Sequence, residues 1–121
     1  MIQDAPSPKA GIRNLFHGII ETMTRGGEKR GCFLNNCAVE VACSDPQAAN
    51  RVAEGLARTE ETFYCAIRRG QKLGEIGADK EPRGLARYLT STLNGLLVMG
   101  KANPDRRALQ DVARIALTAL D

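Results

Sequence analysis

The sequence PQAANRVAEGLARTEETFYCAIRRGQKL, residues 46–73, holds the pattern that decides the fold. Its apolar and small residues recur at alternating steps of four and three: Val52, Leu56, Thr59, Phe63, Ala66 and Gly70. This spacing predicts one long amphipathic helix that packs along other helices. Either Ser44, with Gln47 three residues later, or Asp45, followed by Pro46, can cap its start.

Two helices are predicted before this stretch. The first starts at Ser7-Pro8, a cap followed by a first-turn proline, and ends in the glycine-containing loop 24–31. Its apolar stripe consists of Ile12, Leu15, Phe16, Ile19, Ile20 and Met23. The second lies within GCFLNNCAVEVAC, residues 31–43, and is short and almost wholly apolar, which favours burial on most sides.

Two more helices are predicted after the loop 74–82. One runs from near Pro82 to Gly100, and the other follows the break at residues 101–107 and continues to Leu120. Asn103 or Asp105 can cap the last helix. The whole pattern therefore predicts an all-α fold, an antiparallel bundle of about five helices in one domain.

Composition bounds the class of protein. The chain has 121 residues, of which 43% are hydrophobic and 26% charged, as in globular rather than disordered proteins. Its 17 basic and 14 acidic residues are mixed along the sequence, so the net charge of +3 does not argue for nucleic-acid or membrane binding. No apolar run approaches the ~20 residues of a membrane span, and no signal peptide is evident, so we expect a cytoplasmic protein.

The four cysteines suggest three alternatives. Cys32, Cys37, Cys43 and Cys65 lack the spacing of a zinc site, so no metal is predicted. Cys32, beside Lys29 and Arg30 at a helix start, is a candidate redox-sensing thiol. We favour the third alternative, that all four are small buried residues.

Polar residues in apolar surroundings are candidate ligand contacts. Asn35 and Asn36 either orient a ligand on a cavity wall or bond solvent and neighbouring backbone, and both readings stay open. His17 and Glu21 share a helix face, as a surface pair or as one polar group of a pocket. The charged RTEETF and IRRG segments are interpreted as a solvated helix face.

Two surfaces follow from the helical faces. Phe16, Ile20, Phe63, Ile67, Tyr88 and Thr92 are expected to point inward, where core and pocket wall are the same surface. The last two helices carry more apolar surface than one small chain easily buries, and LTSTLNGLLVMG mixes small and large residues. This combination predicts a homodimer.

The ordered features from about residue 8 resemble the C-terminal domain of tetracycline-repressor-type (TetR family) transcriptional regulators. The matching pieces are Gly31-Cys32-Phe33-Leu34, Asp45-Pro46, Ala66 to Ile76, Leu85 to Val98 and Arg107 to Leu120. No counterpart of the family's N-terminal helix-turn-helix domain is found, so this chain alone is not expected to bind operator DNA. In this resemblance residues 1–6 are a tail from the interdomain region.

The resemblance implies a homodimeric effector-sensing domain without catalytic residues or cofactor. The last two helices would form a four-helix bundle with those of the partner, and a small, mostly apolar effector would occupy a cavity in each subunit and control operator release by the DNA-binding domain. The expected interface residues are Leu93, Gly95, Leu96, Met99, Leu109, Val112, Ala113, Ala116, Leu117 and Leu120. The expected ligand-binding residues are Phe16, His17, Ile20, Asn35, Asn36, Val39, Thr59, Phe63, Ile67, Tyr88 and Thr92.

Two other functions stay open. The same scaffold could sense oxidants or electrophiles through Cys32. A small helical-bundle enzyme is disfavoured, because the chain has one histidine and no evident acid–base or nucleophile constellation.

Overall fold

The computed structural model of the chain describes residues 5–25 and 46–121, and all regular structure in these ranges is helical. The elements are α1 (Pro8–Thr24), α3 (Pro46–Lys72), α4 (Pro82–Ala102), α5 (Arg106–Leu117) and a 3-10 turn, η2 (Thr118–Leu120). The all-α prediction is confirmed. The helix predicted within residues 31–43 and the caps predicted at Ser44 and Asp45 lie outside the described residues.

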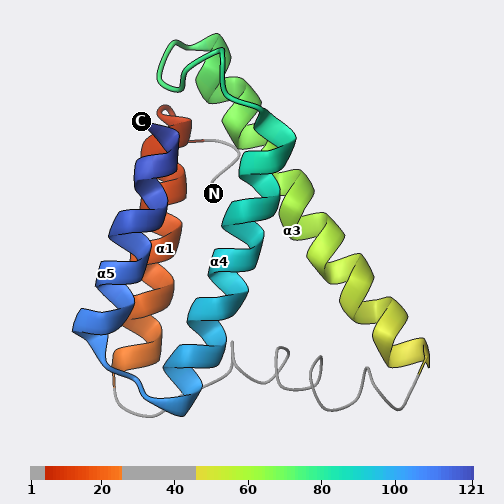
Figure 1. Cartoon of the computed structure of the whole chain (residues 1–121), viewed down its shortest axis with the longest axis vertical. Helices are drawn as coiled ribbons and strands as arrows, with labels where there is room; N and C mark the ends of the chain where they lie inside the picture. Colours follow the sequence, from red (N-terminus) through yellow and green to blue (C-terminus); the bar gives the residue numbers. More distant parts are fainter. Residues whose placement is uncertain (1–4, 26–45) are drawn as a thin grey trace.

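Figure 1 shows α1, α4 and α5 side by side, with α3 crossing them obliquely. Ion pairs connect the two ends of α1 to the end of the chain and to the start of α5: Lys9 Nζ lies 2.7 Å from Asp121 Oδ1, and Arg106 pairs with Glu21. The first turn of α1 therefore meets the end of the chain, so α1 and α5 are antiparallel, as the bundle prediction requires.

Polar side chains start three of the helices. The Ser7 hydroxyl accepts from the Ala10 N–H at 3.1 Å, which confirms the predicted cap of α1. The Asp105 carboxylate accepts from the N–H groups of Arg107 and Ala108, so the structure selects Asp105 over Asn103 for α5. Glu81 caps α4 in the same way, with Pro82 in the first turn.

The last helix is shorter than the sequence indicated. We predicted a continuous helix to Leu120, but the α-helix ends at Leu117 and a 3-10 turn follows. The Thr118 hydroxyl donates to the Ile115 carbonyl at 2.5 Å, a bond that competes with the regular ladder in the last turn. Such tightening is common at helix C-termini.

One apolar core joins the four helices. The rings of Phe16 and Phe63 stack with centroids 6.0 Å apart and an interplanar angle of 24°, and both side chains are at most 1% exposed. Leu89 and Leu96 from α4 and Leu109 from α5 are also fully buried. These residues occupy the predicted apolar stripes of their helices.

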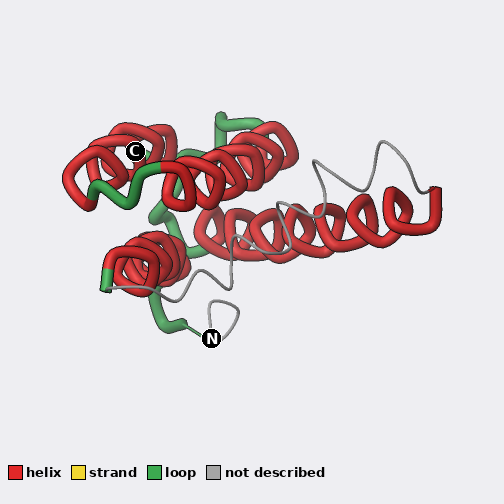
Figure 2. The backbone as a smooth tube through the Cα atoms, turned by 90° about the horizontal axis from the view of Figure 1, so that it is seen from below, coloured by secondary structure: helices red, strands yellow, loops and turns green. Residues whose placement is uncertain are grey.

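The two halves of α3 differ in their surroundings. Phe63, Ala66, Ile67 and Gly70 are buried, whereas Leu56, two turns earlier on the same face, is 40% exposed. Figures 1 and 2 show the N-terminal half of α3 running away from α1, α4 and α5. The helix therefore packs against the bundle mainly through its C-terminal half.

A close approach ends α3. Gly70 accepts from the N–H groups of Glu75 and Ile76, and a Cβ at Gly70 would lie 2.7 Å from Ile76 Cδ1. Gly74 has a φ of 78°, the left-handed conformation that glycine adopts without strain. The Gln71 amide donates to the carbonyls of Gly77 and Lys80 and holds the loop that follows.

The same loop holds the start of α1. Glu75 Oε1 accepts from the Lys9 N–H at 3.1 Å, and the Arg69 guanidinium donates to the Ala5 carbonyl. The hydrogen bond from the Ser7 hydroxyl, followed by that from the Lys9 N–H, lowers the pKa of Glu75. We call Ser7, Lys9, Arg69 and Glu75 the N-terminal clasp.

No helix in the described part of the chain is both long enough and apolar enough to cross a membrane.

Candidate functional site

Four of the predicted ligand-binding residues lie in the core. Phe16, Ile20, Phe63 and Ile67 are 0–1% exposed. They pack on one another and on α4, so core packing accounts for their burial. Phe63 and Ile67 form the closed end of the apolar face of α3, and Phe16 and Ile20 are the α1 residues of the same core.

Toward the start of α3 the side chains of this apolar face are more exposed than Phe63. Val52 is partly buried and Leu56 is 40% exposed, although both repeat the spacing that buries Phe63. The hydroxyl of Thr59 donates to the Gly55 carbonyl at 3.1 Å, so its polar group is satisfied within the helix. We call Val52, Leu56 and Thr59 the open stripe of α3.

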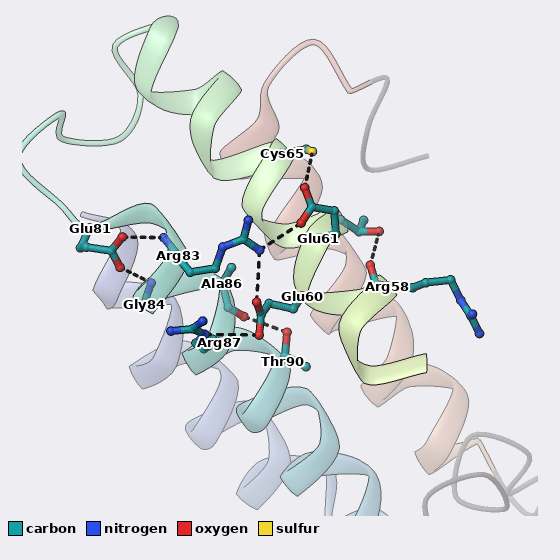
Figure 3. Close-up of polar contacts among 11 residues, drawn as sticks. Arg58, Glu60, Glu61, Cys65, Glu81, Arg83, Gly84, Ala86, Arg87 and Thr90 are labelled. Atoms are coloured by element: carbon teal, nitrogen blue, oxygen red, sulfur yellow. Dashed lines mark hydrogen bonds and ion pairs between the residues drawn. The ribbon is translucent and has the colours of Figure 1, made fainter. Parts of the chain in front are cut away.

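An arginine from α4 holds α3 where the open stripe meets the packed half. Arg83 Nη1 lies 3.1 Å from Glu60 Oε2 and 3.0 Å from Glu61 Oε2, as Figure 3 shows. Its guanidinium carbon sits 3.8 Å from the centroid of the Tyr64 ring, a cation–π contact. Arg87 adds a longer pair to Glu60 at 3.6 Å. We call Arg83, Glu60, Glu61 and Tyr64 the α3–α4 clamp.

The two carboxylates of the clamp stabilise the positive charge of Arg83. The hydrogen bond to Glu61, together with that to Glu60, raises the pKa of Arg83. Arginine suits this place because a planar guanidinium can stack on an aromatic ring while it donates to carboxylates.

Sequence reasoning missed this clamp. We interpreted the RTEETF charges as a solvated face, but Glu60 and Glu61 connect two helices. The available signal was the pair Arg83 and Arg87, four residues apart on one face of α4 and opposite in charge to Glu60 and Glu61.

His17 does not join the apolar face. It is exposed and lies with Arg13 and Glu21 along an open groove between α1 and α5. Glu21 pairs there with Arg25 at 3.2 Å and with Arg106, and the Arg106 hydrogen bond is the main reason why the pKa of Glu21 is lowered. The structure thus separates His17 from Phe16, its neighbour in sequence.

Tyr88 also differs from its predicted position. We expected it to face the interior, but it is 45% exposed. The buried positions of α4 include Ala86, Leu89 and Leu93, and each residue step turns the helix by about 100°, which carries Tyr88 outward. Thr92 is partly buried, and its hydroxyl donates to the Tyr88 carbonyl within the same helix.

Most of the predicted interface residues require a correction. Seven of the ten are at most 9% exposed in the single chain: Leu93, Leu96, Leu109, Ala113, Ala116, Leu117 and Leu120. They fill the core of the chain, because the most apolar faces of α4 and α5 pack against α1 and against each other. Gly95 and Met99 are exposed and Val112 is partly buried.

The outer surface of α4 and α5 carries apolar residues that we did not select. Ile115 is 59% exposed and Val98 46%; Tyr88 and Met99, which we selected for other roles, are exposed as well. Four of the six large exposed hydrophobic side chains among the described residues therefore lie on these two helices; the other two are Leu56 and Leu73.

The prediction that all four cysteines are buried is wrong for Cys65. This residue is exposed, and its Sγ lies 3.9 Å from Glu61 Oε1. Position 65 faces away from Phe63 and Ala66, which point into the core. Within residues 5–25 and 46–121, no three histidine, cysteine, aspartate or glutamate side chains gather in a way that could hold a metal ion.

Several predicted site residues lie outside the described residues. They are Cys32, Asn35, Asn36, Cys37, Val39 and Cys43. Their proposed roles stay predictions.

Comparison with known proteins places this fold in a family. A profile described as "Tetracyclin repressor-like, C-terminal domain" matches residues 8–116. The uncharacterized HTH-type transcriptional regulator YezE of Bacillus subtilis (strain 168) is 30% identical over 120 residues, which cover 98% of this chain and 62% of that protein. The HTH-type transcriptional repressor DhaR of Mycobacterium sp. (strain GP1) is 26% identical over 120 residues, covering 98% of this chain and 59% of that protein.

The chain thus spans about three fifths of the length of these curated relatives. No solved structure matches it significantly. The helical architecture, the matched range and the relatives agree with one another. The chain therefore belongs to the tetracycline-repressor-like family of transcriptional regulators, whose C-terminal domain it matches over residues 8–116.

Proposed function

We propose that this chain is the effector-sensing and homodimerising part of a TetR-type transcriptional repressor. A small, mostly apolar effector binds against the open stripe of α3, and the dimer positions DNA-binding domains of the whole protein on operator DNA. The family match over residues 8–116 carries this proposal, and both relatives are described as HTH-type regulators.

The outer face of α4 and α5 supports a dimer. At about 100° per residue, Tyr88, Gly95 and Met99 fall within roughly 40° of one another on α4. On α5 the apolar side chain of Ile115 is 59% exposed, and Val112 is partly buried at the edge of the core. An exposed apolar face over two adjacent helices is typical of a symmetric interface.

Sedimentation velocity at micromolar concentration tests the interface. The unaltered chain is expected to sediment as a dimer, and Ile115→Glu as a folded monomer, because a buried unpaired carboxylate at a two-fold interface is costly. Leu73→Glu is the matched control, since Leu73 is 56% exposed, directly follows α3 and lies outside α4 and α5, so the dimer should stay intact.

A monomeric wild-type chain would contradict the dimer. A dimeric Ile115→Glu variant would place the interface elsewhere.

The open stripe supports an effector site of apolar character. Leu56 presents apolar surface next to the closed core around Phe16 and Phe63, and Thr59 satisfies its own hydroxyl. Ligand sites are typically apolar with few placed polar groups. An effector that packs here would contact α3, and it would shift a two-state equilibrium by binding one position of this helix better than another.

Fluorescence of the apolar dye N-phenyl-1-naphthylamine tests the effector site. Leu56→Gln is expected to weaken dye binding about tenfold, which corresponds to the loss of roughly 1.4 kcal/mol of apolar contact. Ala57→Gln, one residue away on the exposed side of α3, is the control and should bind the dye unchanged.

Equal affinities in both variants and in the unaltered chain would exclude the open stripe as the effector site.

A further inference from the structure

We propose that the groove between α1 and α5 is a second ligand site, which takes small organic anions with an apolar body. The groove encloses about 620 Å³, a volume within the range of small-molecule sites. Its lining residues belong to α1 and α5 and none of them to α3, so it is separate from the open stripe and the proposed effector site.

Charge in the groove favours an anion. Its two acids already have basic partners: Asp111 lies 3.3 Å from Arg114, and Glu21 pairs with Arg25 and Arg106. Arg13 has no carboxylate within ion-pair distance in the described part of the chain. The acid whose pKa Arg13 lowers from a distance, Asp121, is itself paired with Lys9 at 2.7 Å.

The arrangement of donors suits a carboxylate or a similar oxyanion. Arg13 and His17 are four residues apart on α1, so their side chains project from the same face. A guanidinium offers paired N–H donors to an oxyanion, and the imidazole adds an N–H. Gln110 faces them from α5 and supplies an uncharged amide.

The floor of the groove explains why the ligand should also have an apolar part. Ile20 and Leu117 line it between the charged rims, and they are 1% and 8% exposed. A planar ring resting on this floor would make van der Waals contacts with the small part of Ile20 and Leu117 that is still exposed, while its anionic group reaches Arg13. An inorganic ion would use only the rim.

The groove and the proposed dimer face use different residues of α5. From α5 the groove is lined by Gln110, Asp111, Arg114 and Leu117, and neither Val112 nor Ile115 is among its lining residues.

The chain contains one histidine, and it lies in this groove, so the imidazole C–H resonances of His17 report binding there. At constant pH, titration with 2-naphthoate is expected to shift these resonances saturably. The uncharged 2-naphthamide, which has the same ring system, should bind at least three- to tenfold more weakly because it makes no charge-assisted bond.

Variants test the roles of the individual side chains. Arg13→Gln is expected to weaken 2-naphthoate binding about three- to tenfold, while Arg68→Gln, which removes an exposed arginine from α3, should not change it. Asp111→Asn should tighten binding, because it releases Arg114 from its carboxylate partner. A gain of affinity cannot result from misfolding.

A saturable His17 shift, weakened in Arg13→Gln and strengthened in Asp111→Asn, would support the site. Equal affinities for 2-naphthoate and 2-naphthamide would overturn it, as would equal losses in Arg13→Gln and Arg68→Gln or no gain in Asp111→Asn. Dye binding at the open stripe is measured separately, so failure of this site leaves the proposed effector site untouched.

Discussion

The two halves of α3 have the same amphipathic pattern but different surroundings. In the C-terminal half, Phe63 and Ile67 are almost completely buried against α1 and α4. In the N-terminal half, Leu56 occupies the equivalent position and keeps 40% of its surface exposed. An apolar stripe therefore identifies which face of a helix can be buried, whereas the neighbouring helices determine how much of that face is buried.

The largest expected difference between the halves comes from truncating their apolar side chains. Phe63→Ala should lower the free energy of unfolding by about 3–5 kcal/mol, because it leaves a cavity beside Phe16. Leu56→Ala should cost about 1 kcal/mol or less, since its side chain is only partly covered. Urea unfolding of both variants measures the contrast, and equal losses would mean that the halves are equally packed.

Two glycines of α3 provide a second contrast, because replacement by alanine should change the stability in opposite directions. Gly70→Ala should destabilise by about 1 kcal/mol, because the new Cβ would lie 2.7 Å from Ile76 Cδ1, in a side chain that is 2% exposed. Gly55→Ala should stabilise by about 0.5–1 kcal/mol, since the nearest atom is Arg58 Nη2 at 3.9 Å and alanine favours the helix.

Thermal unfolding of both glycine variants, followed by circular dichroism, shows whether each replacement raises or lowers the stability. Stabilisation by Gly70→Ala would show that Ile76 moves aside without cost.

A smaller effect is expected where the two halves meet. Arg83→Gln removes both ion pairs of the α3–α4 clamp and the contact with Tyr64, so it should lower stability and reduce its dependence on salt. Arg83→Lys keeps the charge but loses the stacked geometry, so it should restore stability only in part.

The control for the clamp is Arg114→Gln, whose pair with Asp111 lies within α5 alone. If both Gln variants lose equal stability in urea, the clamp contributes no more than an ordinary surface pair.

The smallest effect is a pH dependence at the far end of α3. The pKa of Glu75 is lowered in the folded chain, so its ionised form stabilises the fold at neutral pH, and this contribution is lost as the pH falls through that lowered pKa. Glu75→Gln should therefore be less stable than the unaltered chain at neutral pH, and the difference should shrink on acidification below the usual glutamate range.

Urea unfolding across this pH range measures the contribution of Glu75, with Glu54→Gln, an exposed carboxylate of α3, as the control. If the stability difference between Glu75→Gln and the unaltered chain does not change with pH, it does not come from the ionised Glu75 in the N-terminal clasp.

Local signals account for what could be predicted. The Ser7 cap with Pro8, the proline at the start of α4 and the Asp105 cap are interactions between residues close in sequence, and the helices begin where these signals stand. The buried faces of α1 and α3 followed from periodicity, as Phe16, Phe63 and Ile67 show. The candidate site was predicted less well, because it depends on which face each helix turns to which neighbour.

The amino-acid sequence by itself determined the all-α class, the helix starts and the family, because caps, prolines and apolar spacing act within a few residues of the chain. Tertiary structure alone decided that Leu56 is half covered, that Tyr88 points outward and that Arg83 joins Glu60 and Glu61. It also placed His17 opposite Gln110, in a groove between helices far apart in sequence. The physical reason is that burial and charge pairing depend on how helices pack in space, which the periodicity of one helix does not specify.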